Sequence, residues 1–107
     1  MPDTVTIPRP RPVEIRGTAP DRGWKVQLHN DDVTPFDVVI FALQKAAGLS
    51  LEVAEMVAQE AHRTGTAVVR RGLTQEDAER IAGRLVALTT IDGICPGVEA
   101  EAVADDA

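Results

Sequence analysis

Hydrophobic and polar positions along the chain follow two periods, and these predict a small domain built from strands and helices. Residues 23–29 alternate between apolar and polar side chains, as a half-buried strand does. The next apolar segment contains no internal breaker and predicts a buried helix over 34–47. Thr34 fits the N-cap of this helix, Asp37 completes a capping-box pattern, and Gly48 follows its C-terminus.

The rest of the pattern predicts two further helices and two further strands. In chain order they are a helix over 50–64, a strand over 66–69, a loop over 70–72, a helix over 74–88 and a strand over 91–101. Ser50 and Thr74 are suitable N-caps, and Gly65 ends the second helix. Pro96 restricts the last strand to an edge position or a bulge.

This order, β-α-α-β-α-β, predicts an α+β fold with three helices on one face of a small, three-stranded, mostly antiparallel sheet. The domain is expected to span 23–101. Residues 1–22 hold five of the seven prolines and four arginines without an apolar period, so we expect a disordered, proline-rich N-terminal arm. Residues 102–107 are expected to form a loose C-terminal tail.

Composition excludes several functions. A chain of 107 residues, 44% of them apolar, is long enough for one domain with a modest core. The net charge of -6 argues against nucleic-acid binding, which needs clustered lysine and arginine. The sequence has no long apolar segment and no signal-peptide core, so no membrane span is expected. The single cysteine, Cys95, cannot form an internal disulfide, and a cytoplasmic protein is the simplest interpretation.

Two places carry candidate chemistry. Asn30, Asp31 and Asp32 put amide and carboxylate oxygens between the first strand and the first helix, although such residues also simply shape turns and cap helices. His62 stands in the last turn of the second helix, where a histidine often only interacts with the helix dipole. Taken separately, each of the two groups could have a purely structural role.

Together and in order, these motifs resemble the ClpS family, the adaptor of the Clp protease that delivers proteins bearing N-degrons. The resemblance covers about residues 24–88. It is carried by Trp24-Lys25-Val26, Asn30-Asp31-Asp32-Val33-Thr34-Pro35, Val38-Val39, Leu43-Gln44-Lys45, Ala61-His62-Arg63-Thr64-Gly65-Thr66-Ala67 and Ala78-Glu79. The family's fold has the same order of elements.

The resemblance implies that the N-terminal residue of a substrate enters a small pocket. A free α-ammonium has three N–H donors and needs several converging acceptors, which Asn30, Asp31, Asp32 and a neutral His62 would supply. An acetylated N-terminus loses both the charge and the donors, so an unblocked N-terminus should be required. Because the acceptor role needs the neutral imidazole, we expect binding to weaken in mild acid.

The same resemblance implies an apolar hole for the substrate's first side chain, with a preference for Leu, Phe, Tyr and Trp. The residues that match its lining are Leu28, Thr34, Phe36, Val39, Ala58 and Ala61. Phe36 stands where the family usually has a gating methionine, and the two alanines stand where larger residues are common. We therefore expect a shifted ranking of N-terminal residues, still favouring large unbranched or aromatic ones.

For delivery, the resemblance implies docking on the N-terminal domain of a ClpA- or ClpC-like AAA+ ATPase, with the arm engaged by that machine. Glu76, Glu79 and Arg80 are candidates for the docking surface. No catalytic residue and no cofactor are expected, so the chain is predicted not to be an enzyme.

The sequence admits three other classes of function. A metal or enzyme site could be drawn from His29, Asp31, Asp32 and His62, but His29 should face the other side of its strand and no nucleophile lies near. A module like the C-terminal domain of the ribosomal stalk protein has a similar topology, but this chain lacks its basic surface. A ClpS-like paralogue that modulates the Clp ATPase without N-degron delivery is the main alternative.

Overall fold

The computed structural model describes residues 22–105. The expected N-terminal arm, apart from Arg22, lies outside the described residues, as do residues 106 and 107. No helix within the described part is long and apolar enough to cross a membrane.

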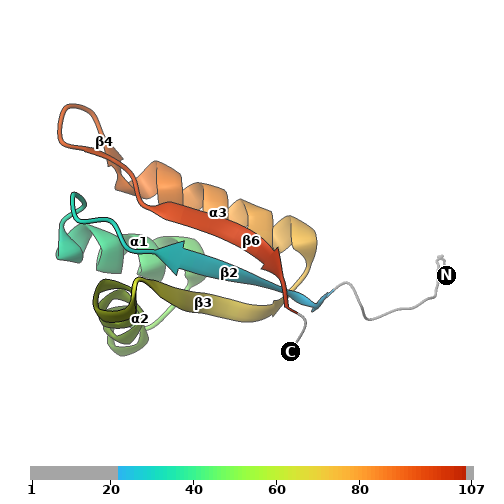
Figure 1. The fold of residues 1–107 in the computed structure, drawn as a ribbon. Coiled ribbons are helices and arrows are strands. Elements are labelled where there is room, and N and C mark those ends of the chain that lie inside the picture. Colours follow the sequence, from blue (N-terminus) through green and yellow to red (C-terminus); the bar gives the residue numbers. More distant parts are fainter. Residues whose placement is uncertain (1–21, 106–107) are drawn as a thin grey trace, which may run out of the picture.

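Three strands form the main sheet: β2 (Trp24–His29), β3 (Thr66–Leu73) and β6 (Glu99–Ala104). The strand order is β3-β2-β6, and both pairings are antiparallel. The helices α1 (Phe36–Ala47), α2 (Leu51–Thr64) and α3 (Gln75–Thr89) lie on one side of this sheet (Figure 1). The predicted α+β fold, with three helices and a three-stranded antiparallel sheet, is confirmed.

The core lies between the sheet and the helices. Val26 is 0% exposed and Leu28 is 2% exposed, while their neighbours on β2 are half-buried, so the alternation in the sequence reflects one covered face. The helices contribute mainly leucine and alanine to the core, from positions three and four apart. The buried face of α2 consists of three alanines and Val57, so it carries little side-chain bulk near the C-terminal end of the helix.

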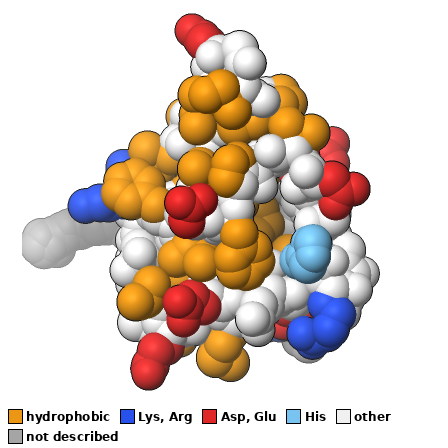
Figure 2. Space-filling view, turned by 90° about the vertical axis from the view of Figure 1, so that its left-hand side faces the viewer, with side chains coloured by type: hydrophobic (Ala, Val, Ile, Leu, Met, Phe, Trp, Pro, Cys, Tyr) orange, Lys and Arg blue, Asp and Glu red, His pale blue; other side chains and the backbone are white. Residues whose placement is uncertain are grey.

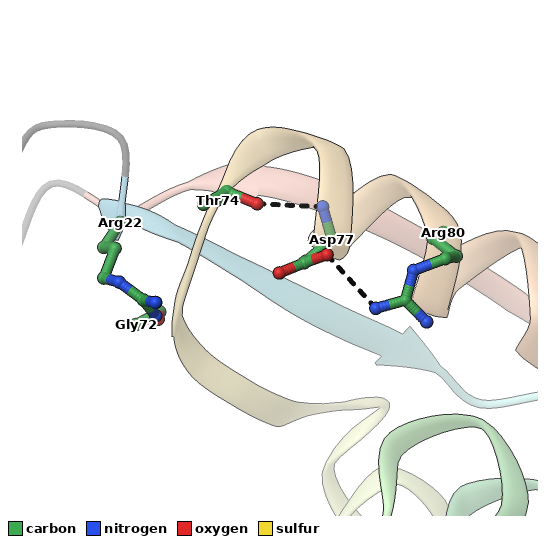
Figure 3. Close-up of polar contacts among 5 residues, drawn as sticks. All are labelled: Arg22, Gly72, Thr74, Asp77 and Arg80. Carbon is green, nitrogen blue, oxygen red and sulfur yellow. Dashed lines mark hydrogen bonds and ion pairs between the residues drawn. The ribbon is translucent and has the colours of Figure 1, made fainter. Parts of the chain in front are cut away.

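Two of the predicted caps are confirmed. Ser50 Oγ accepts a hydrogen bond from the N–H of Val53 at 3.2 Å, and Thr74 Oγ1 accepts one from Asp77 at 3.0 Å (Figure 3). Gly48 and Gly65 end α1 and α2 in left-handed conformations, with φ of 69° and 98°.

The predicted loop at 70–72 is wrong, because β3 continues through these residues to Leu73. The strand stays paired with β2 because the pairing register shifts twice. One shift lies between Trp24 and Val26, and the other between Val26 and Gln27. The guanidinium of Arg70 donates to the carbonyl of Ala47 at 2.8 Å, at the C-terminus of α1. Arg70 and Arg71, which the sequence pattern places in a loop, therefore belong to a bulged strand.

The C-terminal region also differs from prediction. The expected strand over 91–101 is divided: β4 (Thr90–Ile91) and β5 (Cys95–Pro96) form a separate hairpin, and β6 begins after it. Gly97, with φ of 100°, follows Pro96 and turns the chain back toward β2.

Residues 102–104, expected in a loose tail, extend β6 and pair with the first half of β2. The N–H of Asp105 bonds the carbonyl of Gly23 at 2.7 Å, and its carboxylate lies 3.7 Å from Lys25 and 2.6 Å from Arg71. The ordered domain therefore continues beyond its predicted end at 101.

Candidate functional site

A cavity of about 170 Å³ opens where β2 ends and α1 begins, beside the C-terminal end of α2. Every residue assigned from the sequence to the α-amino site or to the apolar hole lines it, together with His29 and Val98. The lining consists of Leu28, His29, Asn30, Asp31, Asp32, Thr34, Phe36, Val39, Ala58, Ala61, His62 and Val98. Segments far apart in the sequence thus meet at one end of the molecule.

One backbone hydrogen bond fixes the polar side of the cavity. The N–H of Asn30 donates to the carbonyl of Gly65 at 2.9 Å, which ties the loop after β2 to the end of α2. The side-chain amide of Asn30 donates to Asp32 Oδ1 at 3.1 Å. The amide oxygen of Asn30 thereby remains an acceptor, and it lies beside a carboxylate.

Asp31 organises the loop itself. Its carboxylate accepts a hydrogen bond from the N–H of Val33 at 2.8 Å and another from the hydroxyl of Thr34. The Thr34 hydroxyl, and to a lesser degree the backbone N–H groups, hold the pKa of Asp31 below its ordinary value, against the opposing effect of burial. Asp31 is therefore a stable negative charge whose oxygens already have partners within the loop.

The predicted N-cap at Thr34 is wrong for the same reason. Helix α1 begins at Phe36, its N-cap position is Pro35, and no side chain caps it. The Thr34 side chain points instead to Asp31, and the residue is 8% exposed at the cavity.

The floor of the cavity is apolar and comes from several elements. Leu28 on β2, Ala58 and Ala61 on α2, and Val98 before β6 are each less than 5% exposed. Val39, one turn into α1, is half-buried against them. An apolar cavity of about 150 Å³ is known to hold benzene, so this cavity is sized for one side chain rather than for a larger ligand.

Two rings flank the opening. Phe36, at the start of α1, is 42% exposed, and its ring stands edge-on to that of His62 in the last turn of α2. The centroids are 6.4 Å apart and the planes are inclined at 78°. The Phe36 side chain therefore lies beside the imidazole of His62, which has a ring nitrogen that can accept a hydrogen bond.

The charge around the opening is negative. Asp31 and Asp32 line the polar side, and no lysine or arginine is part of the lining. Figure 2 looks at this end of the molecule and shows hydrophobic side chains gathered on it, with acidic side chains among them and a histidine at their edge. Such a site favours a small cation attached to an apolar group.

His29 and Val98 were not assigned to the site from the sequence. The ring of His29 lies 2.7 Å from Glu101 on β6, so it faces the side of the sheet opposite Leu28 as expected, although the residue also borders the cavity. Val98 is 4% exposed and reaches the cavity only because the turn after Pro96 carries it there. No local pattern around Val98 signals this position.

The candidate docking residues lie elsewhere, on α3. Glu76 and Glu79 line a shallow groove together with Trp24, Thr74 and Gln75. Arg80 donates to Asp77 at 3.1 Å and is not part of the groove lining (Figure 3). This groove and the cavity adjoin opposite ends of β2.

A metal site is the other chemistry that the sequence allows at the cavity. Among residues 22–105 no group of three or more histidine, cysteine, aspartate or glutamate side chains is placed to hold a metal ion. Cys95 is buried, and its thiol donates to the carbonyl of Thr89.

The chain is a small α+β domain with a compact apolar pocket that carries carboxylates at its rim. The family model for ATP-dependent Clp protease adaptor protein ClpS matches residues 19–93. The chain belongs to the ClpS family.

Two relatives agree with this assignment. The ATP-dependent Clp protease adapter protein ClpS of Aromatoleum aromaticum (strain DSM 19018 / LMG 30748 / EbN1) is 47% identical over 51 residues. That alignment spans 48% of this chain and 50% of the adapter protein, so it covers about half of the relative's length. The structure of Agrobacterium tumefaciens ClpS2 bound to L-phenylalaninamide is similar with a TM-score of 0.69 and 29% identity, over 77% of this chain and 95% of that one.

Proposed function

We propose that this chain is an adaptor that binds the free N-terminal residue of N-degron proteins and delivers them to a Clp AAA+ ATPase and its protease. The observation that carries the proposal is the cavity itself: an apolar floor sized for one side chain, beside acceptors and carboxylates without a basic neighbour in the lining. The ligand of A. tumefaciens ClpS2, L-phenylalaninamide, is a free amine attached to an aromatic side chain and supports the same chemistry.

In this proposal the polar side takes the α-ammonium. The Asn30 amide oxygen, the Asp32 carboxylate and a ring nitrogen of His62 accept its three N–H donors, while Asp31 holds the loop and adds negative charge. Each charge-assisted hydrogen bond contributes about 1.5–3 kcal/mol. The apolar floor takes the side chain, and burying it contributes about 1.5–3 kcal/mol.

Binding should therefore need both halves of the N-terminal residue. The test is fluorescence anisotropy of a labelled peptide that begins with Phe, compared with its N-acetylated twin, on the parent chain and on His62→Ala and Asp32→Ala. Arg63→Ala, on the same helix end, and Asp92→Ala, on the exposed β4–β5 turn, are matched controls.

We expect binding that disappears with the acetyl group, falls at least about tenfold with either site substitution, and is unchanged in the controls; a tenfold loss corresponds to about 1.4 kcal/mol. Equal weak binding of both peptides would contradict the proposal and favour the alternative of a ClpS-like paralogue that only modulates the ATPase.

Delivery requires a second surface, and we assign it to the α3 groove with Glu76 and Glu79, and to Arg80 beside it. The partner proposed for this surface is the N-terminal domain of a ClpA- or ClpC-like ATPase. The arm over 1–22 is proposed to enter that machine.

A further inference from the structure

The segment that brings Val98 to the cavity starts from the last turn of α3. The β4–β5 hairpin follows Thr89 directly and lies at the same end of the molecule as the start of α1 (Figure 1). Val98 comes between this hairpin and β6, and the pairing of β6 with β2 begins only at Glu99. Val98 is 4% exposed, so its backbone N–H needs a hydrogen-bond partner from outside the sheet.

The side chain of Thr89 supplies this partner. Thr89 Oγ1 accepts a hydrogen bond from the N–H of Val98 at 2.9 Å and donates one to the carbonyl of Leu85 at 2.7 Å. Bonding to the carbonyl four residues earlier is common for a threonine in a helix, whereas the bond from Val98 joins two elements. Thr89 is 0% exposed, so no water replaces either contact. One buried hydroxyl therefore ties the chain before β6 to the end of α3.

The neighbouring contacts leave the hairpin little freedom. The thiol of Cys95 donates to the carbonyl of Thr89 at 3.1 Å. The hydroxyl of Thr90 lies 3.1 Å from the carbonyl oxygen of Pro96. A Cβ at Gly97 would lie 2.5 Å from Thr90 Oγ1, so only glycine allows the chain to pass this close to the end of α3. These contacts fix the hairpin up to Gly97, and the Thr89 hydroxyl then fixes the next residue.

The place of Val98 matters for the size of the cavity. Val98 shares the apolar floor with Leu28, Ala58 and Ala61, of which the two alanines carry only a methyl group. The cavity holds about 170 Å³. An apolar cavity of about 150 Å³ accepts benzene, so a phenyl ring fits this space, whereas an indole is larger. A movement of Val98 would therefore change which ring the floor accommodates.

We propose that Thr89 is a positioning residue: its hydroxyl fixes Val98 in the cavity floor and thereby sets a preference for phenylalanine over tryptophan at the N-terminus of a bound peptide. The inference rests on the proposed function, because the cavity must hold the first residue. Thr89 is not part of the cavity lining, so it acts through Val98. Thr89→Val keeps a similar shape but leaves the N–H of Val98 unpaired, and the loosened floor then admits the larger ring.

The test measures Kd values for labelled peptides beginning with Phe or Trp, and for the N-acetylated Phe peptide. The proteins are the parent chain, Thr89→Val, Thr89→Ser, Val98→Ala and the double variant Thr89→Val/Val98→Ala. Leu73→Ala is the control for general destabilisation, because Leu73 is buried but lies outside the cavity lining. Amide hydrogen exchange at Val98, followed by NMR without peptide, reports the tether itself.

We expect the parent to prefer the Phe peptide at least about fivefold, and Thr89→Val to reduce this preference at least about threefold. Exchange at Val98 should become faster in Thr89→Val. Thr89→Ser keeps the oxygen and should retain the parent preference and exchange rate, as Leu73→Ala should retain the preference. In the Val98→Ala background, Thr89→Val should cause no further change, because the side chain through which it acts is gone.

Two results would overturn the role of Thr89 while the proposed function stands. One is amine-dependent binding with the same preference in Thr89→Val as in the parent. The other is an equal change of preference in Thr89→Val and Leu73→Ala, which would assign the effect to stability. Absence of binding by the parent, or equal binding of the free and acetylated Phe peptides, would refute the proposed function and this inference with it.

Discussion

At the scale of single residues, the two carboxylates after β2 have different partners. Asp31 accepts hydrogen bonds from Val33 and Thr34, both within the loop, whereas Asp32 accepts one from the Asn30 side chain. Asp32 is also the more exposed of the two. Asp31 is therefore suited to hold the loop, and Asp32 to accept a hydrogen bond from a ligand.

Asp31→Ala should lower the free energy of unfolding by about 1 kcal/mol at pH 7, because it removes hydrogen bonds that the charged carboxylate accepts. Asp32→Ala should leave the free energy of unfolding nearly unchanged while it weakens peptide binding. Both are measured by urea denaturation, with the fluorescence of Trp24, the single tryptophan, as the signal.

The effect of Asp31 should depend on pH. Because its pKa is lowered in the folded state, the unfolded chain binds the proton more readily. The stabilisation is fully present above about pH 4, the ordinary range of aspartate, and is lost as the pH falls through the lowered value. The difference between parent and Asp31→Ala should therefore shrink below pH 4; a difference that grows in acid would contradict this assignment.

Phe36 should set the choice among apolar N-terminal residues. Its ring stands edge-on to His62 and lines the cavity, so we expect it to obstruct a β-branched side chain, whereas Ala58 and Ala61 in the same lining are small. We expect a Leu-initiated peptide to bind about tenfold more tightly than its Ile counterpart, or about 1.4 kcal/mol. Phe36→Ala should reduce this ratio and Phe41→Ala, which replaces an exposed phenylalanine outside the cavity lining, should not. Equal binding of the Ile and Leu peptides to the parent chain would refute this role of Phe36.

At the scale of elements, the end of α2 connects folding with the site. Gly65 adopts φ of 98°, and its carbonyl accepts the N–H of Asn30. The C-terminal turn of one helix thus positions the loop that carries the acceptors.

Gly65→Ala should therefore lower the free energy of unfolding by about 1 kcal/mol, because a Cβ is unfavourable at this φ although nothing lies within 4 Å of it. It should also weaken binding of the Phe peptide. Gly83→Ala is the matched control: Gly83 lies on the exposed face of α3 with open space around it, and alanine there should stabilise the chain by about 0.5–1 kcal/mol without changing affinity. Loss of affinity in both variants would contradict the role of Gly65.

Elements with strong local signals could be predicted from the sequence, and those that depend on distant pairing could not. The alternation in β2, the caps at Ser50 and Thr74 and the glycines after α1 and α2 are local, and the structure confirms them. The segment 70–72 looks like a loop because two arginines and a glycine hide the strand period, and only pairing with β2 extends it. The same holds for 102–104, whose partner lies at the other end of the chain.

The candidate site divides in the same way. Acceptors and small residues in recognisable motifs can be assigned from the sequence, but their roles remain predictions that binding must test. Val98 belongs to no motif, and only the hairpin before it brings it to the cavity. The partnership of Thr34 with Asp31 was missed because a threonine before a proline also fits a helix cap.

At the scale of the molecule, β2 separates two surfaces. Its C-terminal end, His29, borders the cavity, and its N-terminal residue, Trp24, lines the groove with Glu76 and Glu79. The strand spans about 17 Å at about 3.4 Å per residue. Arg22, where the chain enters the described domain, donates to the carbonyl of Gly72 close to the start of α3 (Figure 3). Arg22, the first described residue, thus lies beside the proposed docking surface, at the end of β2 opposite the pocket.

This separation predicts that docking and substrate binding can be abolished independently. Glu76→Lys/Glu79→Lys should leave the Kd for the Phe peptide unchanged, because neither residue contacts the cavity. With the same variant, a ClpA- or ClpC-like ATPase and its protease should degrade a Phe-initiated protein at least about tenfold more slowly. The reason is that reversed charges across an interface oppose association. Glu60→Lys/Asp92→Lys, at exposed positions outside the cavity and the α3 groove, changes the net charge equally and should keep the parent rate. Equal loss of rate in the two variants would show that overall charge governs delivery; loss of peptide binding in the α3 variant would show that the two surfaces are not separate. Retention of the parent rate in the α3 variant would move the docking surface away from α3.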